Sequence, residues 1–165
     1  MKDLSATPLS YPEQGATSGE MPSGYHHMRR TAVIGYGRAA FDAAARRLFS
    51  WQMHRGAGLR VTASGPPAEG RVVQLRLGPF SGCCRVVYVV DEPHRRGFAY
   101  GTLRGHPERG EEFFGVRFDP TTATVYADIV AFSRPGRWWS RLAAAPAGWL
   151  QRRVTDRYLR ALTSD

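Results

Sequence analysis

The residues best suited to chemistry lie in the segment 100–114, which reads Tyr-Gly-Thr-Leu-Arg-Gly-His-Pro-Glu-Arg-Gly-Glu-Glu-Phe-Phe. It contains one imidazole, His106, and three carboxylates, Glu108, Glu111 and Glu112. Carboxylates beside an imidazole can transfer protons or hold a divalent metal. His106 with Glu111 or Glu112 is therefore the candidate catalytic set. Their spacing matches no metal-binding motif, so we expect neither a metal nor a cofactor.

A second interpretation of this segment is structural. His106 and Pro107 fit an ordinary turn, and glutamates are common on exposed hairpins. Under this interpretation the glycines serve only the turn, and the carboxylates are solvated. The sequence leaves both interpretations open.

Two hydroxyl groups precede the turn, on Tyr100 and Thr102. Alternate side chains of a strand share one face, so both hydroxyls lie on the same face as Phe98. If that face is the inner one, the hydroxyls enter the interior, where each needs a hydrogen-bond partner. A ligand or one of the glutamates could supply the partner, and so could neighbouring backbone.

Helices and strands must position these residues, and the hydrophobic pattern predicts both. Apolar residues at helical spacing predict one helix over 38–53 and a second that ends near residue 162. Strands are expected over 30–34, 59–63, 71–77, 84–90, 96–103, 112–118 and 123–133. The turns recur about every ten residues, which favours an antiparallel meander over alternating strands and helices.

This order predicts an α+β fold, in which a curved antiparallel sheet of about six to seven strands grips a long C-terminal helix. Such a helix-grip layout can leave an apolar cavity between the sheet and the helix. Phe41 and Trp51, on the stripe of the first helix, are expected near the cavity wall. A binding site there requires a cavity of roughly 300 Å³ or more.

The chain of 165 residues fits a single domain. Composition alone predicts a flexible arm over 1–27. No apolar run approaches the roughly 20 residues that span a bilayer, and no signal peptide is evident. Cys83 and Cys84 are adjacent, which favours free thiols and a cytoplasmic location.

The formal net charge is +9 and comes mostly from arginine. The C-terminal third contains many of these arginines: Arg134, Arg137, Arg141, Arg152, Arg153, Arg157 and Arg160. With Trp138 and Trp139 they are similar to a surface that binds nucleic acid or an anionic membrane. A solvated helix face with core tryptophans is the alternative.

Several motifs resemble those of the uncharacterised protein family 0548, a domain-of-unknown-function family. They are Leu9-Ser10-Tyr11-Pro12-Glu13 with Gly15, Pro22 with Gly24-Tyr25, Gly35 and Gly37, Phe41, Trp51-Gln52-Met53-His54, Tyr100-Gly101-Thr102-Leu103, Gly105-His106-Pro107-Glu108, Gly110-Glu111-Glu112, Phe132-Ser133-Arg134-Pro135, and Gln151 with Arg157-Tyr158-Leu159. The likeness covers about residues 9–162. It implies no activity, but it implies that the arm from Leu9 to Tyr25 packs on the domain. The resemblance thus limits the flexible N-terminus to 1–8 and implies one domain over 9–165, with an N-terminal arm over 9–27. The predicted layout is also similar to that of the START and Bet v 1 superfamily of lipophilic-ligand binders.

Three functions follow as hypotheses. The first is the binding of a small, mostly apolar ligand, with Tyr100, Thr102, His106, Trp51, Phe41 and Arg134 as ligand-binding candidates. The second is a hydrolase or cyclase-like enzyme that uses His106 with Glu111 or Glu112. The third is the binding of nucleic acid or an anionic membrane through the C-terminal arginines, which we rank below the lipophilic ligand.

Overall fold

The computed structural model describes residues 4–136 and 144–163, and of residues 144–153 it describes the backbone only. The structure contains seven strands: β1 (His26–Tyr36), β2 (Arg60–Ala63), β3 (Val72–Leu77), β4 (Phe80–Glu92), β5 (Arg95–Thr102), β6 (Glu108–Asp119) and β7 (Thr124–Pro135). The helices are η1 (Ala16–Ser18), a single 3-10 turn, and α1 (Arg38–Phe49), α2 (Gln52–Gly56) and α4 (Ala144–Thr163).

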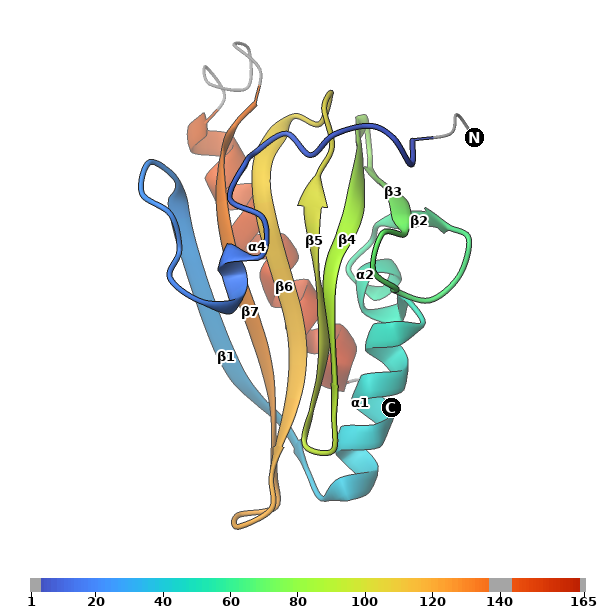
Figure 1. The fold of residues 1–165 in the computed structure, drawn as a ribbon. Helices are drawn as coiled ribbons and strands as arrows, with labels where there is room; N and C mark the ends of the chain where they lie inside the picture. The colour runs from blue at the N-terminus through green and yellow to red at the C-terminus, as the bar shows by residue number, and fades with distance from the viewer. Residues whose placement is uncertain (1–3, 137–143, 164–165) are drawn as a thin grey trace.

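The strands form one antiparallel sheet in the order β1-β7-β6-β5-β4-β3-β2. Consecutive strands from β2 to β7 are neighbours, and β1 completes the sheet beside β7. Figure 1 shows α4 behind this curved sheet, with α1 along the β2 side and the N-terminal arm in front. The predicted α+β helix-grip layout is confirmed.

The core lies between the inner face of the sheet and the helices. Its largest members are aromatic, including Phe41 of α1, Phe98 of β5, Phe114 of β6 and Tyr158 of α4. Aromatic side chains bury large apolar areas, so this cluster is a main source of the stability of the domain. None of the helices that the structure describes is long and apolar enough to cross a bilayer.

The helix predicted over 38–53 is in fact two helices. It breaks at Trp51, whose backbone φ of 63° lies in the left-handed region that most side chains avoid. The Trp51 indole donates a hydrogen bond of 2.9 Å to the Gly65 carbonyl, and its ring lies 5.2 Å from the Phe98 ring. Tertiary contacts of one side chain thus override the helical pattern of the sequence.

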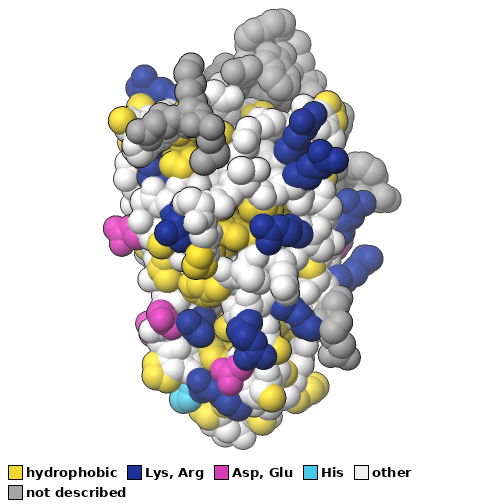
Figure 2. All heavy atoms as spheres, turned by 90° about the vertical axis from the view of Figure 1, so that its right-hand side faces the viewer, with side chains coloured by type: hydrophobic (Ala, Val, Ile, Leu, Met, Phe, Trp, Pro, Cys, Tyr) yellow, Lys and Arg dark blue, Asp and Glu magenta, His cyan; other side chains and the backbone are white. Residues whose placement is uncertain are grey.

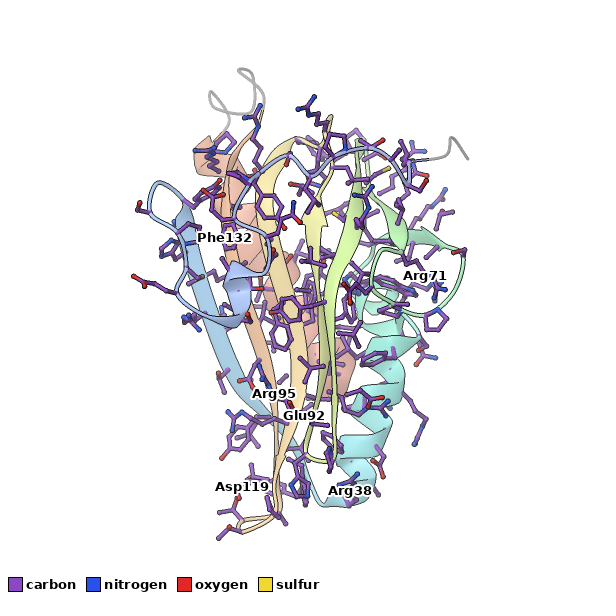
Figure 3. All side chains as sticks on the ribbon, in the orientation of Figure 1. Arg38, Arg71, Glu92, Arg95, Asp119 and Phe132 are labelled. Carbon is purple, nitrogen blue, oxygen red and sulfur yellow. The ribbon has the colours of Figure 1, made fainter. Side chains whose placement is uncertain are left out.

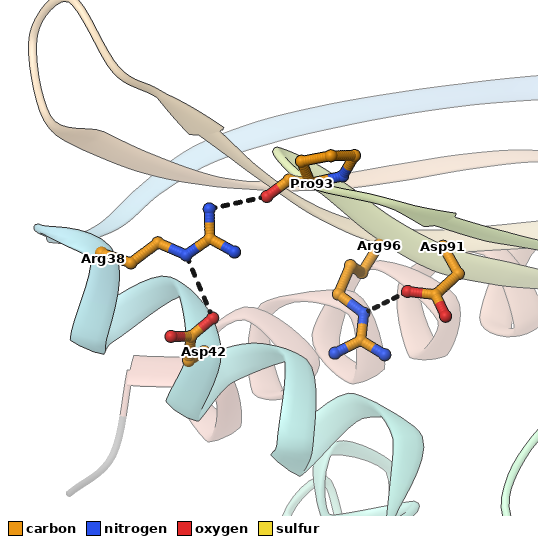
Figure 4. Close-up of polar contacts among 5 residues, drawn as sticks. All are labelled: Arg38, Asp42, Asp91, Pro93 and Arg96. Carbon is orange, nitrogen blue, oxygen red and sulfur yellow. Dashed lines mark hydrogen bonds and ion pairs between the residues drawn. The ribbon is translucent and has the colours of Figure 1, made fainter.

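The N-terminus of α1 is fastened to the tip of the β4–β5 hairpin. The Arg38 guanidinium donates to the Pro93 carbonyl at 2.7 Å and to Asp42 at 3.3 Å (Figure 4). Arg96 makes an ion pair of 2.8 Å with Asp91 on the same hairpin (Figure 4). These exposed contacts orient the helix rather than stabilise it strongly.

The N-terminal arm crosses the outer face of the sheet, where Figure 3 places the labelled Phe132 beneath it. Tyr11 and Tyr25 contact the Phe132 ring edge-on at centroid distances of 5.6 and 5.1 Å. The arm therefore packs on the domain, as the family resemblance implies. Flexibility of residues 1–8 stays a prediction, and in the structure the carbonyls of Leu4, Ser5 and Thr7 accept hydrogen bonds from Arg85.

Candidate ligand site

A cavity of about 210 Å³ lies between the inner face of the sheet and α4. Its described lining is largely apolar and includes Leu59, Leu75, Leu77, Phe80, Cys84, Ala131 and the polar side chains discussed below. The volume does not reach the roughly 300 Å³ that the sequence-based hypothesis required, so the prediction of a cavity for a full-sized lipophilic ligand is wrong. The cavity can therefore admit a fragment the size of one substituted ring, but not a whole lipid.

Aromatic rings at the base of the cavity explain its small volume. The His54 imidazole of α2 lies 4.9 Å from the Phe114 ring, 5.2 Å from Tyr158 and 5.7 Å from Tyr100. These rings fill the space in which the sheet and α4 would otherwise leave a longer hollow. Sequence reasoning placed no polar side chain there, although His54 belongs to one of the family motifs.

His54 is fully buried, and neither ring nitrogen has a hydrogen-bond partner. Burial lowers its pKa from 6.5 to about 3, with a smaller contribution from Arg55. The imidazole is thus held neutral in an aromatic surrounding, because a charged ring would lack both solvent and a counter-ion.

Three polar groups meet on one side of the cavity. Tyr100 of β5 and Glu112 of β6 are direct cross-strand partners on the inner face, and Tyr158 reaches them from α4. The Tyr100 and Tyr158 hydroxyls are hydrogen-bonded to each other. Burial is the main cause that raises the pKa of both phenols, and the nearby Glu112 carboxylate raises them further. Both phenols are therefore protonated at every physiological pH.

Glu112 is half-buried and lines the cavity. Burial raises the pKa of its carboxyl from 4.5 to about 7. No hydrogen bond or ion pair joins this carboxylate to another residue in the described part of the chain. A carboxyl group with a pKa near neutral, in an apolar cavity, is the kind of group found at functional sites.

Glu111 has the opposite environment, on the outer face of the sheet. Its carboxylate accepts hydrogen bonds from the Tyr11 hydroxyl at 2.6 Å and the Gly15 amide at 2.8 Å. It also accepts bonds from the Thr17 hydroxyl at 2.5 Å and the Thr17 amide at 3.2 Å. Glu111 therefore fastens the arm to the sheet, and its lone pairs are occupied by that role.

His106 lies at the mouth of the cavity, in the loop between β5 and β6. Its Nδ1 accepts a hydrogen bond of 3.0 Å from the Glu108 amide. The ring packs against Gly82 of β4, where an added Cβ would lie 2.0 Å from the ring. Burial lowers the His106 pKa to about 4. No hydrogen bond to Glu111 or Glu112 is among its described contacts.

The other candidate residues fall into two groups. Thr102 lines the cavity, but its hydroxyl contacts Ser10 of the arm at 2.6 Å and accepts a bond from the Gly110 amide. Phe41 and Trp51 are buried in the core and Arg134 lies 4.5 Å over the Tyr25 ring. None of these three is among the described residues that line the cavity.

Sequence reasoning did not select Cys84, Tyr158 or His54. Tyr158 was visible as a member of the apolar stripe of the C-terminal helix, but a stripe does not reveal which hydroxyl meets Tyr100. Within the described residues, no three His, Cys, Asp or Glu side chains are grouped so that they could hold a metal ion.

Comparison with known proteins gives consistent results. A family model described as a domain of unknown function, DUF1990, matches residues 10–161. A UPF0548 protein of Deinococcus radiodurans is 37% identical over 169 residues, which cover 93% of this chain and 85% of that protein.

Two solved structures share the fold at low sequence identity. A hypothetical protein from Helicobacter pylori matches with a TM-score of 0.66 and 8% identity, and the match covers 94% of each chain. Truncated norcoclaurine synthase from Thalictrum flavum matches with a TM-score of 0.55 and 10% identity, over 89% of this chain and 99% of that one. These likenesses concern the architecture alone, which is that of the Bet v 1-like helix-grip proteins. The sequence match over nearly the whole domain goes further, and the chain belongs to the DUF1990 family, the uncharacterised family 0548 whose motifs it resembles.

Proposed function

We propose that this protein binds a small, mostly apolar ligand in the cavity between the sheet and α4. The observation that carries the proposal is the cavity itself, whose apolar walls surround the polar group of Tyr100, Glu112 and Tyr158. Binding sites for small molecules combine apolar walls with a few convergent polar groups in this way. Tyr100 and Glu112 would provide polar contacts, and His106 would border the entrance.

The enzyme hypothesis based on His106 receives less support. Glu111 is occupied by the arm, and His106 hydrogen-bonds to the backbone of its own loop. A low pKa also makes His106 a weak base. We retain the cytoplasmic location as part of the proposal, since Cys83 and Cys84 are both free thiols.

A pair of neighbouring cysteines gives a matched test. Cys84 lines the cavity, whereas Cys83 points to the opposite face of β4. Cys84→Leu adds volume inside the cavity, and Cys83→Leu adds the same volume outside it. Binding of small aromatic probes can be measured by NMR titration and native mass spectrometry.

We expect Cys84→Leu to abolish probe binding and Cys83→Leu to leave it unchanged. Circular dichroism would verify that both variants fold, because an overpacked core costs about 1–3 kcal/mol of stability. Equal binding by wild type and Cys84→Leu, or no binding of any probe to the wild type, would rule the proposal out.

A further inference from the structure

Glu112 brings a negative charge into the cavity without a partner from the described lining. On the sheet its carboxylate is flanked by Tyr100 of β5 and Ala131 of β7. The other titratable groups around it are Cys84 of β4, Tyr158 of α4, and His106 and Glu108 at the mouth. None of them supplies a positive charge at neutral pH, because burial holds the pKa of His106 at about 4.

An ionised carboxylate removed from water is unfavourable unless a counter-charge or several hydrogen bonds compensate it. Glu111, the preceding residue, receives four hydrogen bonds from the arm. Glu112 receives none that the structure describes, although it is the carboxylate that faces the cavity. No described residue compensates this charge, so a molecule that displaces solvent from the half-buried carboxylate would have to supply the compensation itself.

We propose that the ligand carries a protonated amine, which pairs with Glu112, on an apolar body of about one ring that fills the rest of the cavity. This inference rests on the proposed function, because it specifies the ligand of the same cavity. An ammonium group offers a positive charge and up to three donors. The rings of Tyr100 and Tyr158 would add attraction between the cation and their faces.

The polar surface of the cavity favours a donor ligand over an acceptor ligand. The Glu112 carboxylate is an acceptor without a described donor, whereas the hydrogen bond between Tyr100 and Tyr158 uses one of their two O–H donors. The Thr102 hydroxyl is occupied by Ser10 and Gly110. A ligand that offers only acceptors would need Glu112 in its protonated form, so the two ligand classes predict opposite proton movements.

Two probes of equal size test the inference with the full chain. Phenethylamine is protonated at pH 7.5, and 2-phenylethanol is its neutral counterpart. We expect the wild type to bind the amine about tenfold or more tighter than the alcohol, a difference that corresponds to about 1.4 kcal/mol. In Glu112→Gln we expect the two affinities to become equal, while retained alcohol binding shows that the cavity is intact.

Proton release provides an independent readout. Burial raises the pKa of Glu112 to about 7. In the free protein at pH 7 the Glu112 carboxyl is therefore about half protonated. Pairing with an ammonium lowers this pKa, and calorimetry in two buffers should detect about half a proton released per amine bound. Cys84, Tyr100 and Tyr158 stay protonated and His106 stays neutral at this pH, and Glu112→Gln should abolish the release.

The outcomes separate the two proposals. If the alcohol binds as tightly as the amine, or if binding takes up a proton, the amine inference is wrong and the cavity remains a ligand site. If neither probe binds the wild type at millimolar concentration, the proposed function and the inference both fail. An amine preference that survives in Glu112→Gln would also overturn the inference.

Discussion

Neighbouring residues of β6 differ sharply in their surroundings. Glu111 is 2% exposed and has four hydrogen bonds to the arm, whereas Glu112 faces the cavity without a hydrogen bond from any described residue. His54 behaves like Glu112 in one respect, since burial disfavours the charged form of each. The acid and the base respond to pH in opposite directions, so each gives a separate prediction.

Glu112→Gln should stabilise the fold above neutral pH. The folded-state pKa of Glu112 is about 7, above its usual 4.5. The group therefore contributes fully to stability below pH 4.5, and this contribution is lost as the pH rises through 7. Glutamine has no such loss, so the stability of the variant relative to wild type should increase between pH 4.5 and 8 by up to about 3 kcal/mol.

Urea unfolding at several pH values would measure this change for Glu112. Glu69→Gln, at an exposed position of the β2–β3 loop, is the control and should follow the wild type. A Glu112→Gln curve that runs parallel to the wild-type curve would show that Glu112 is not desolvated.

His54→Leu should weaken the acid sensitivity of the fold. The folded-state pKa of about 3 lies below the usual 6.5, so stability is greatest above pH 6.5 and is lost as the pH falls toward 3. Between pH 7 and pH 4 the imidazole accounts for a loss of about 3 kcal/mol, which leucine removes. Urea unfolding of the wild type and His54→Leu at pH 7 and pH 4 would measure this difference in the free energy of unfolding.

A matched replacement controls for the number of histidines. His26→Leu removes an exposed imidazole on β1 and should leave the acid sensitivity of the wild type. If His54→Leu loses as much stability as the wild type between the two pH values, the imidazole is not held neutral by the aromatic rings.

Among the elements, the arm and the sheet share several contacts, and four of their hydrogen bonds end on the Glu111 carboxylate. Glu111 joins the β6 strand to Tyr11, Gly15 and Thr17, and a further bridge pairs Leu9 with Leu103. The arm also covers Thr102, whose hydroxyl contacts Ser10. The arm therefore closes the outer side of the strand segment that borders the cavity mouth.

Glu111→Ala should release the arm, because four donors lose their acceptor. Hydrogen bonds to a charged group contribute about 1.5–3 kcal/mol each. The free energy lost with all four bonds is therefore larger than the other contacts of the arm can compensate. We expect the Gly15 and Thr17 amides to exchange with solvent at least tenfold faster, and proteases to cleave within 9–25. NMR would measure the hydrogen-exchange rates of the two amides.

Glu13→Ala is the control within the arm, since Glu13 makes one described side-chain hydrogen bond, to the Tyr25 hydroxyl at 2.7 Å. Its effect on the Gly15 and Thr17 amides should be small. Equal protection of these amides in wild type and Glu111→Ala would mean that the apolar contacts with Phe132 hold the arm unaided.

For the whole molecule, the dominant feature is the positive charge. Figure 2 shows the side of the molecule that carries α1, β2 and β3, where arginines are spread across the surface with few acidic residues between them. On the C-terminal helix, Arg157 is exposed, whereas the side chains of Arg152 and Arg153 are outside the described residues, as are Arg137 and Arg141. Binding of nucleic acid or anionic membrane by this helix therefore stays a prediction.

Heparin chromatography with two triple variants would test whether the arginines of the C-terminal helix bind anions more strongly than arginines elsewhere on the surface. One variant replaces Arg152, Arg153 and Arg157 with Gln, and the other replaces the exposed Arg46, Arg60 and Arg76. We expect both variants to elute at a lower salt concentration than the wild type, and at the same concentration as each other. The reason is that a charge spread over the whole surface attracts heparin in proportion to the net charge. A clearly larger loss for the first variant would identify the C-terminal helix as an anion-binding surface.

The order of the elements and the identity of the segment that borders the cavity can be inferred from the amino-acid sequence. Turn residues and hydrophobic spacing predict all seven strands and the C-terminal helix, although β1, β4 and β6 each begin four residues earlier than predicted. Strand alternation also requires Glu111 and Glu112 to point to opposite faces. These properties are local, so they can be inferred from neighbouring residues.

The sequence does not reveal which carboxylate faces inward, how large the cavity is, or where His54 lies. Those properties depend on pairing between β5 and β6, on the packing of α4, and on the break of the first helix at Trp51. Each of them joins residues far apart in the chain, and the pattern of any one segment does not contain them. The cavity that Tyr100, Glu112 and Tyr158 share is therefore a property of the folded domain, although each residue was visible in the sequence.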